Sequence, residues 1–212
     1  MPWRLTLTAA ALLTVATLRA AGGVSIDFES LPMGVPPENF AFAASRMPAP
    51  GLWEVRGATK NHHLVHPADR SVTVRALSIA MPDVLAPASI KLAVKMRLVD
   101  NDRAAGLVWR FRDANNFYFT SIFLGARSAT LIRVSDGNRI MLDQVQNIEP
   151  DADAWHTLTV VHDGDQIRVN LNGIGIMRAR DAVLTDGGRA GVWSAGNSTT
   201  MFDDLSLEEV PD

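Results

Sequence analysis

The last part of the chain, residues 188–205, constrains the fold most. It reads Gly-Arg-Ala-Gly-Val-Trp-Ser-Ala-Gly-Asn-Ser-Thr-Thr-Met-Phe-Asp-Asp-Leu, with an apolar residue at nearly every second position and a polar stretch in the middle. Side chains of a β-strand alternate between two faces, so this pattern predicts two strands joined by a polar turn. Helical periodicity is almost absent after residue 23, so we expect an all-β chain. The clearest strand-like runs are 71–77, 89–98, 105–112, 117–124, 129–134, 155–161, 166–171, 189–194 and 201–207.

Tight turns between these runs indicate antiparallel hairpins. Asp-Gly and Asn-Gly dipeptides supply the positive φ angles of hairpin turns, and they occur at 136–138, 163–165 and 172–173. They predict hairpins over 129–142, 155–171 and 166–177. The proline-rich segment 31–51 is predicted to be a surface loop, because proline is rare in central strands. The strand-like ends 24–28 and 201–207 are expected to pair and close the domain.

Length and composition limit the class of protein. A chain of 212 residues with 47% hydrophobic residues suits one domain with a substantial core. The net charge of −3 comes without a basic patch, which argues against nucleic acid as a partner. The chain has no cysteine, so it forms no disulfide and carries no lipidated cysteine anchor.

Residues 1–21 have the pattern of a secretory signal peptide. Arg4 provides a positive charge, an apolar run follows over 5–18, and small residues follow Arg19. The apolar run is short for a bilayer span, although an uncleaved membrane anchor is the alternative. We therefore expect a single domain over 22–212, located in the periplasm or outside the cell, with no stable membrane span after cleavage.

Alternation separates two faces of the central strands. Leu107, Trp109 and Phe111 share one face of their strand, and Phe117, Phe119 and Phe123 share one face of the next. These faces are expected to pack between two sheets. The opposite face would then be open and would carry Arg110, Arg112, Tyr118 and Thr120.

Several segments resemble a known family. The run 105–118 (Ala-Gly-Leu-Val-Trp-Arg-Phe-Arg-Asp-Ala-Asn-Asn-Phe-Tyr) resembles a segment of secreted bacterial laminin G-like domains, which are related in fold to glycoside hydrolase family 16. Gly51–Val55, Trp155–Leu158 and 191–205 add further matches. The resemblance implies a single antiparallel β-sandwich of the concanavalin A-like jelly-roll type. The chain departs from the family pattern at Ala195 and Asn197, and again at 121–126, where polar residues are lost.

This resemblance and the open face together predict a carbohydrate-binding module without catalysis. Aromatic rings stack on sugar rings, and Arg, Asn and Asp bind sugar hydroxyls. A glycan or polysaccharide is the expected partner. Core packing is the alternative role for Trp193, and a salt bridge is the alternative for Arg110. The expected ligand contacts are Arg110, Arg112, Tyr118, Arg133, Trp193 and Asn197.

An enzyme and an interaction module are the competing hypotheses. Retaining glycosidases need two carboxylates about 5.5 Å apart, and the family 16 motif Glu-x-Asp-x-x-Glu is absent from the sequence. No Gly-x-Ser-x-Gly motif occurs either. A glycoside hydrolase would have to use carboxylates such as Asp113 or Asp203. A protein-interaction module without sugar binding is the third hypothesis.

A structural calcium ion is a further expectation, although no cofactor is required. Leu205 and Leu207 are expected to face the core, which would place Asp203 on the same side. A buried carboxylate needs a partner, and Ca²⁺ bound by Asp203 with Asp27 and Glu29 is one option, an arginine another.

The histidines are not expected to bind a metal ion if 62–66 is a strand, although a loop conformation could bring them together. His62 and His66 would lie about 13 Å apart on a strand, too far for one metal ion. This segment is expected to be solvated, and His156 is expected to be structural.

Overall fold

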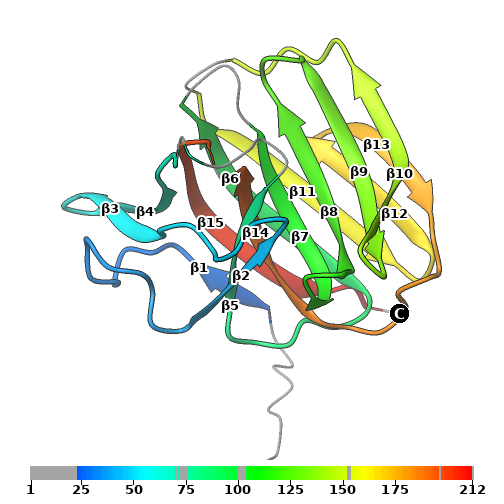
Figure 1. Ribbon diagram of the computed structural model, residues 1–212, viewed down its shortest axis with the longest axis horizontal. Helices are drawn as coiled ribbons and strands as arrows, with labels where there is room; N and C mark the ends of the chain where they lie inside the picture. The colour runs from blue at the N-terminus through cyan, green and yellow to red at the C-terminus, as the bar shows by residue number, and fades with distance from the viewer. Residues whose placement is uncertain are drawn as a thin grey trace, which may run out of the picture.

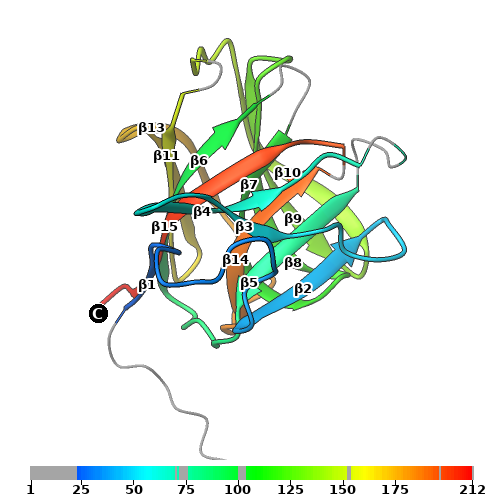
Figure 2. The same ribbon diagram turned by 90° about the vertical axis from the view of Figure 1, so that its left-hand side faces the viewer.

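The computed structural model describes residues 23–69, 71, 76–99, 104–151, 154–195 and 197–211. The predicted signal peptide, residues 1–21, lies outside this range. All regular elements of the described residues are β-strands, and they form two antiparallel sheets packed face to face (Figures 1 and 2). The predicted fold class, an all-β sandwich of the concanavalin A-like jelly-roll type, is confirmed. No described helix is long and apolar enough to cross a membrane.

The first sheet has a central row of seven strands, and one further strand pairs beside β15. Its order is β13 (Ile174–Arg180), β12 (Gln166–Leu171), β11 (His156–Asp163), β6 (Ile90–Leu98), β15 (Thr200–Glu209), β4 (Asn61–His66) and β3 (Glu54–Ala58), with β1 (Val24–Ile26) paired to β15.

The second sheet has seven strands. Its order is β10 (Asn138–Gln146), β9 (Ser128–Ser135), β8 (Asn116–Phe123), β7 (Ala104–Asp113), β14 (Arg189–Ala195), β5 (Leu77–Pro82) and β2 (Phe40–Ser45).

The pairing confirms the three predicted hairpins and the closure of the domain by its ends. β9 pairs with β10, β11 with β12, and β12 with β13. Val24 lies opposite Leu207 and Ile26 opposite Leu205, as expected for ends that pair. The strands of the 188–205 stretch, β14 and β15, belong to different sheets, so the polar turn between them crosses from one layer to the other.

The proline-rich segment contains a strand that the sequence analysis missed. β2 lies within the predicted loop 31–51 and pairs with β5 at the edge of the second sheet. Prolines flank β2 without interrupting it, and an edge strand is the position that tolerates such neighbours. The strand predicted over 71–77 falls mostly outside the described residues, because 72–75 are not among them, and β5 begins at Leu77.

Apolar side chains form two separate clusters. The larger lies between the sheets and includes residues of both, among them Leu92, Val160, Leu107 and Trp109. The second cluster, which we call the outer cluster, contains residues of the second sheet only: Leu77, Ile79, Met81, Val108, Phe111, Phe117, Phe119, Val134, Trp193 and Ala195. The prediction that Phe111, Phe117 and Phe119 pack between the sheets is therefore wrong, because both faces of β8 are apolar.

A β-bulge explains why β7 breaks its alternation. Trp109 and Arg110 together oppose Ala190 of β14, and Arg110 has a φ angle of 47°. A bulge of this kind turns two consecutive side chains to one face. Trp109 and Arg110 therefore both point between the sheets, and Phe111 moves to the outer cluster.

Candidate functional site

Arg110 is enclosed by protein rather than open to a ligand. Its side chain is 2% exposed. Nη1 donates to the carbonyl of Leu184 at 2.6 Å, while Nε and Nη2 donate to the carbonyl of Ala88 at 3.2 and 2.9 Å. Nη2 also donates to the carbonyl of Gly164 at 3.2 Å. The predicted open-face position of Arg110 is wrong, since the bulge turns the side chain inward to join three loops.

Tyr118 and Arg133 also form hydrogen bonds and an ion pair inside the sandwich. The Tyr118 hydroxyl donates to Asp181 Oδ1 at 2.5 Å and accepts a hydrogen bond from the Leu184 amide at 3.2 Å. Arg133 Nη1 forms an ion pair with the other oxygen of Asp181. Burial raises the pKa of Tyr118 to about 12. Tyr118 faces the core, not an open face, because β8 turns its phenylalanines outward.

The remaining predicted contacts lie apart from these. Arg112 is exposed and pairs with Asp186 at 2.9 Å. Trp193 is 3% exposed in the outer cluster, where its Nε1 donates to the Thr120 carbonyl at 2.6 Å. Asn197 is half-buried in the turn between β14 and β15. The structure does not bring the six residues together, and it places Trp193 in the core position that was the alternative.

Asp203 faces outward, contrary to the expectation. β15 has a second bulge at Asp204, whose φ angle is 47°. Relative to β6, Asp204 is one extra residue between Asp203 and Leu205. Leu205 therefore points inward while Asp203 does not. Burial raises the pKa of the half-buried Asp203 carboxyl.

The carboxylates predicted to bind calcium mostly accept hydrogen bonds from backbone amides. Asp27 Oδ1 accepts from the Glu29 amide at 3.1 Å, and Glu29 Oε1 accepts from the His62 amide at 3.2 Å. Across the described ranges, no three His, Asp or Glu side chains gather as a metal site. The donor set as it stands does not fit a calcium ion, which takes six to eight oxygen ligands.

Asp113 and Asp203, the carboxylates considered for hydrolysis, do not face each other. Asp113 lies at the end of β7 in the second sheet, and Asp203 lies on the outer face of the first. The Asp113 carboxylate accepts from the Asn115 amide at 2.7 Å and from the Asn116 side chain at 3.1 Å, which fixes the β7–β8 turn.

Three histidines are buried, and the sequence analysis did not predict this for His66 and His162. His66 lies against Trp53 with ring centroids 4.9 Å apart, and its Nδ1 lies 3.0 Å from the Ser198 carbonyl oxygen. The expectation of a solvated 62–66 segment is therefore wrong for His66. His162 is fully buried, and its Nδ1 accepts from Trp109 Nε1 at 2.9 Å. The structural role of His156 is confirmed by contacts to the Asp151 carbonyl and the Asn172 side chain.

We expect the buried His162 to make the stability of the domain depend on pH. Burial, followed by the nearby Arg110 charge, lowers its pKa to about 4 from 6.5. Between these values the unfolded chain binds a proton and the folded chain does not, so stability falls as pH drops from about 6.5 to 4 and then levels. The shift corresponds to about 3 kcal/mol. Urea unfolding across this pH range measures it.

His162→Asn is the matched variant, because asparagine keeps a neutral acceptor near Trp109. We expect the wild-type free energy of unfolding to fall more steeply than that of the variant between pH 6.5 and 4. If the free energies of unfolding of the two proteins fall in parallel with pH, His162 is not the source of the pH dependence.

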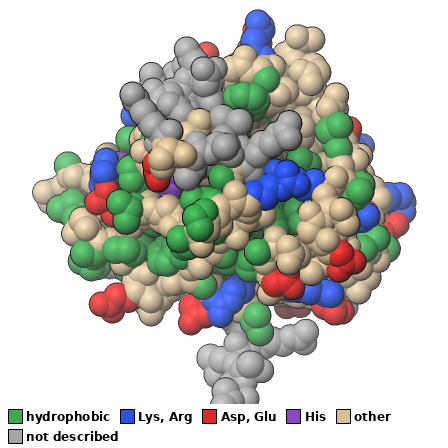
Figure 3. All heavy atoms as spheres, viewed as in Figure 1, with side chains coloured by type: hydrophobic (Ala, Val, Ile, Leu, Met, Phe, Trp, Pro, Cys, Tyr) green, Lys and Arg blue, Asp and Glu red, His purple; other side chains and the backbone are tan. Residues whose placement is uncertain are grey.

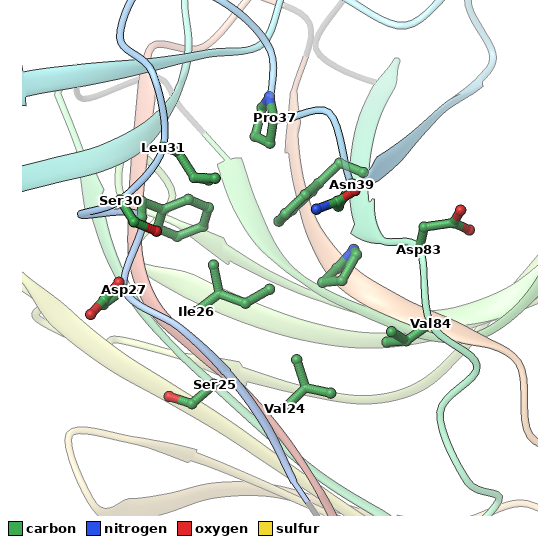
Figure 4. Close-up of a pocket in the computed structure, with 13 residues that line it drawn as sticks. Val24, Ser25, Ile26, Asp27, Ser30, Leu31, Pro37, Asn39, Asp83 and Val84 are labelled. Carbon is green, nitrogen blue, oxygen red and sulfur yellow. The ribbon is translucent and has the colours of Figure 1, made fainter. Parts of the chain in front are cut away.

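An open groove lies between the edges of the two sheets (Figure 4). It has a volume of about 510 Å³ and is lined by 13 residues of β1, β2, the loop between them and the end of β5. The apolar part consists of Val24, Ile26, Phe28, Leu31, Pro37, Phe40, Pro82 and Val84, and the polar part of Ser25, Asp27, Ser30, Asn39 and Asp83. The size falls within the usual range of ligand pockets.

The groove combines an aromatic floor with a polar rim. The Phe28 and Phe40 ring centroids lie 6.0 Å apart, and Phe28 is buried while Phe40 is half-buried. Asn39, Asp27 and Asp83 are exposed at the rim. Figure 3 shows hydrophobic side chains over the left and the centre of this view, where Figure 1 draws β3, the loop between β1 and β2, and β2. An apolar ring platform with hydroxyl, amide and carboxylate groups around it suits a sugar.

Sequence reasoning missed this groove for an identifiable reason. Part of its wall, including Phe40, comes from the segment predicted to be a loop, and its two sides are brought together only by the stacking of the sheets. The alternating run Phe40-Ala41-Phe42 was the one local signal for a strand there.

Comparison with known proteins supports the fold. No protein-family model matches the sequence, and no curated protein matches it. Among solved structures, the carbohydrate-binding module CBM66 from Bacillus subtilis superposes with a TM-score of 0.63 at 14% identity, over 81% of this chain and 96% of that one. A Bacillus licheniformis β-glucanase gives 0.61 at 12% identity, over 91% and 100%.

A third structure was solved with a sugar. Domain 4 of AbnA, an extracellular GH43 arabinanase from Geobacillus stearothermophilus in complex with arabinotriose, gives a TM-score of 0.56 at 10% identity, over 87% of this chain and 90% of that one. At these identities the similarities show a shared fold. That fold occurs both in sugar-binding modules and in glycosidases, so it does not by itself decide between them.

Proposed function

We propose that this protein is a non-catalytic carbohydrate-binding module that holds a glycan in the groove between β1 and β2. The observation that carries the proposal is the groove itself, in which a half-buried Phe40 is bordered by Asn39 and two carboxylates. The sugar-binding proteins among its structural neighbours add support from the fold. Binding consists of ring stacking and hydrogen bonds, with no covalent step.

The charge of the groove favours uncharged sugars. Asp27 and Asp83 carry negative charge, and Asp83 is paired with Arg189 at 2.5 Å. The 13 described lining residues include no Lys, Arg or His. A sugar carboxylate or sulfate would lose its hydration here without gaining a cationic partner among the lining residues.

Export is part of this proposal. Residues 1–21 have the charge, apolar run and small residues of a signal peptide, and a glycan-binding module acts where polysaccharides occur. The mature protein would then be residues 22–212, in the periplasm or outside the cell.

A glycan array tests the proposal. Residues 22–212 are applied in the presence of calcium and again with a chelator, which also tests the expected calcium ion. We expect a specific signal for an uncharged glycan. Phe40→Ala and Asn39→Ala should each weaken it about 5- to 30-fold, as loss of a ring contact or a hydrogen bond of about 1–2 kcal/mol predicts.

Leu85→Ala is the matched control, because Leu85 is an exposed apolar residue beside the groove that does not line it. Its binding should equal that of the wild type. A blank array, or a signal that Phe40→Ala and Asn39→Ala leave unchanged while folding is preserved, would contradict the groove as a glycan site.

A further inference from the structure

The outer face of the first sheet carries an organised set of polar groups away from the groove. In the strand register, Thr157 lies opposite Lys95, and Lys95 lies opposite Asp203. Continuing the register of β15 and β4 places His63 beside Asp203. These four residues alternate with core residues, so they form one row across β11, β6, β15 and β4.

Trp155 borders this row. It precedes His156, which lies opposite Met96, so it is level with Arg97. Trp155 is 39% exposed, whereas the other three tryptophans of residues 22–212 are buried. Its ring lies 5.9 Å from that of His63 at an interplanar angle of 75°. Tryptophan with an exposed ring beside polar groups is a typical element of sugar sites.

Some polar atoms on this face lack a hydrogen-bond partner within the protein. Arg97 is half-buried, and its Nε is shielded from solvent without a hydrogen-bond partner. His63 Nδ1 and Glu29 Oε2 are likewise buried without a hydrogen-bond partner. Lys95, in contrast, is paired with Asp204 at 2.5 Å. Shielded polar groups without partners are rare, and a buried water is one explanation for them.

We propose that this face is a second sugar-contact surface, on which Trp155 stacks on a sugar ring while Arg97, His63 and Asp203 bind its hydroxyls. Arg97 and His63 provide donors and Asp203 provides an acceptor, which suits an uncharged hydroxyl-rich ligand rather than an anion. The inference shares the ligand class of the proposed function but uses none of the groove residues, so either site can exist without the other. A chain with both sites binds a polysaccharide at two points and gains avidity.

Four proteins on one glycan array separate the possibilities: the wild type, Phe40→Ala, Trp155→Ala and the double variant. Arabinotriose and a soluble β-glucan are included as probes, alongside the uncharged polysaccharides of the array. We expect Phe40→Ala to keep part of the signal on a polysaccharide, and the double variant to lose at least 10-fold more. Ile174→Ala, which changes another exposed apolar residue of the first sheet, should bind as the wild type does.

Arg97→Gln and a fluorescence measurement keep the test independent of folding. Because Trp155 is the one exposed tryptophan of residues 22–212, a bound sugar should protect its emission from acrylamide quenching, and Arg97→Gln should reduce that protection. If Phe40→Ala alone removes all binding and Trp155 stays equally quenchable, the second surface is disproved while the groove stands. If only Trp155→Ala removes binding, the second surface stands and the groove fails. A blank with all sugars overturns both.

Discussion

Arg110→Met should destabilise the domain by about 3–5 kcal/mol, one of the two largest losses that we expect from a single side chain. The guanidinium donates to the carbonyls of Ala88, Gly164 and Leu184, which come from three separate loops. Methionine fills much of the same volume but leaves these oxygens without their donors. For a domain of this size the melting temperature should fall by roughly 10 °C, measurable by calorimetry.

Arg112→Met is the matched control for this experiment. Arg112 lies two residues away on the same strand, but it is exposed and has only a surface ion pair with Asp186. Surface pairs contribute about 0–1 kcal/mol, so this variant should unfold close to the wild-type temperature. Equal stability of the two variants would show that Arg110 does not organise the interior.

Asp181→Ala should cost about 3–5 kcal/mol, because it leaves a partly buried arginine without its counter-charge. Asp181 accepts from the Tyr118 hydroxyl and from the Val183 amide, and it also pairs with Arg133. Urea unfolding measures the loss. Asp165→Ala removes an exposed carboxylate that pairs with Arg180, and it should change stability by less than about 1 kcal/mol.

A double-mutant cycle shows whether Tyr118 and Asp181 act together. Tyr118→Phe removes only the hydroxyl, and we expect it to cost about 1–2 kcal/mol. Combined with Asp181→Ala, it should show a coupling energy of at least about 0.5 kcal/mol. Strictly additive losses would contradict the shared hydrogen bond at 2.5 Å.

The local features of the fold could be predicted because they depend on neighbouring residues. The turns at Gly137, Gly164 and Gly173 all have positive φ, and each joins two strands that pair as predicted. The strand-like ends 24–28 and 201–207 also pair, as was expected for a jelly roll.

The side-chain directions at the candidate site could not be predicted, because two bulges reverse the alternation. Arg110 and Asp204 both have φ 47°, yet arginine is not a residue that signals this conformation. One extra residue in β7 turns Arg110 inward, and one extra residue in β15 leaves Asp203 outward. Strict alternation implies the opposite direction for each side chain. The groove was missed for another reason, since it forms between segments that only the stacked sheets bring together.

The most direct test of the glycan-binding proposal is a map of backbone NMR shifts on residues 22–212, titrated with the uncharged oligosaccharide that gives the strongest array signal. We expect the largest changes at 24–31, 37–40 and 82–84, the segments that line the groove. A smaller second set at Trp155 and Arg97 would report the outer face. Saturable changes confined to other parts of the molecule, with these segments unmoved, would contradict the account.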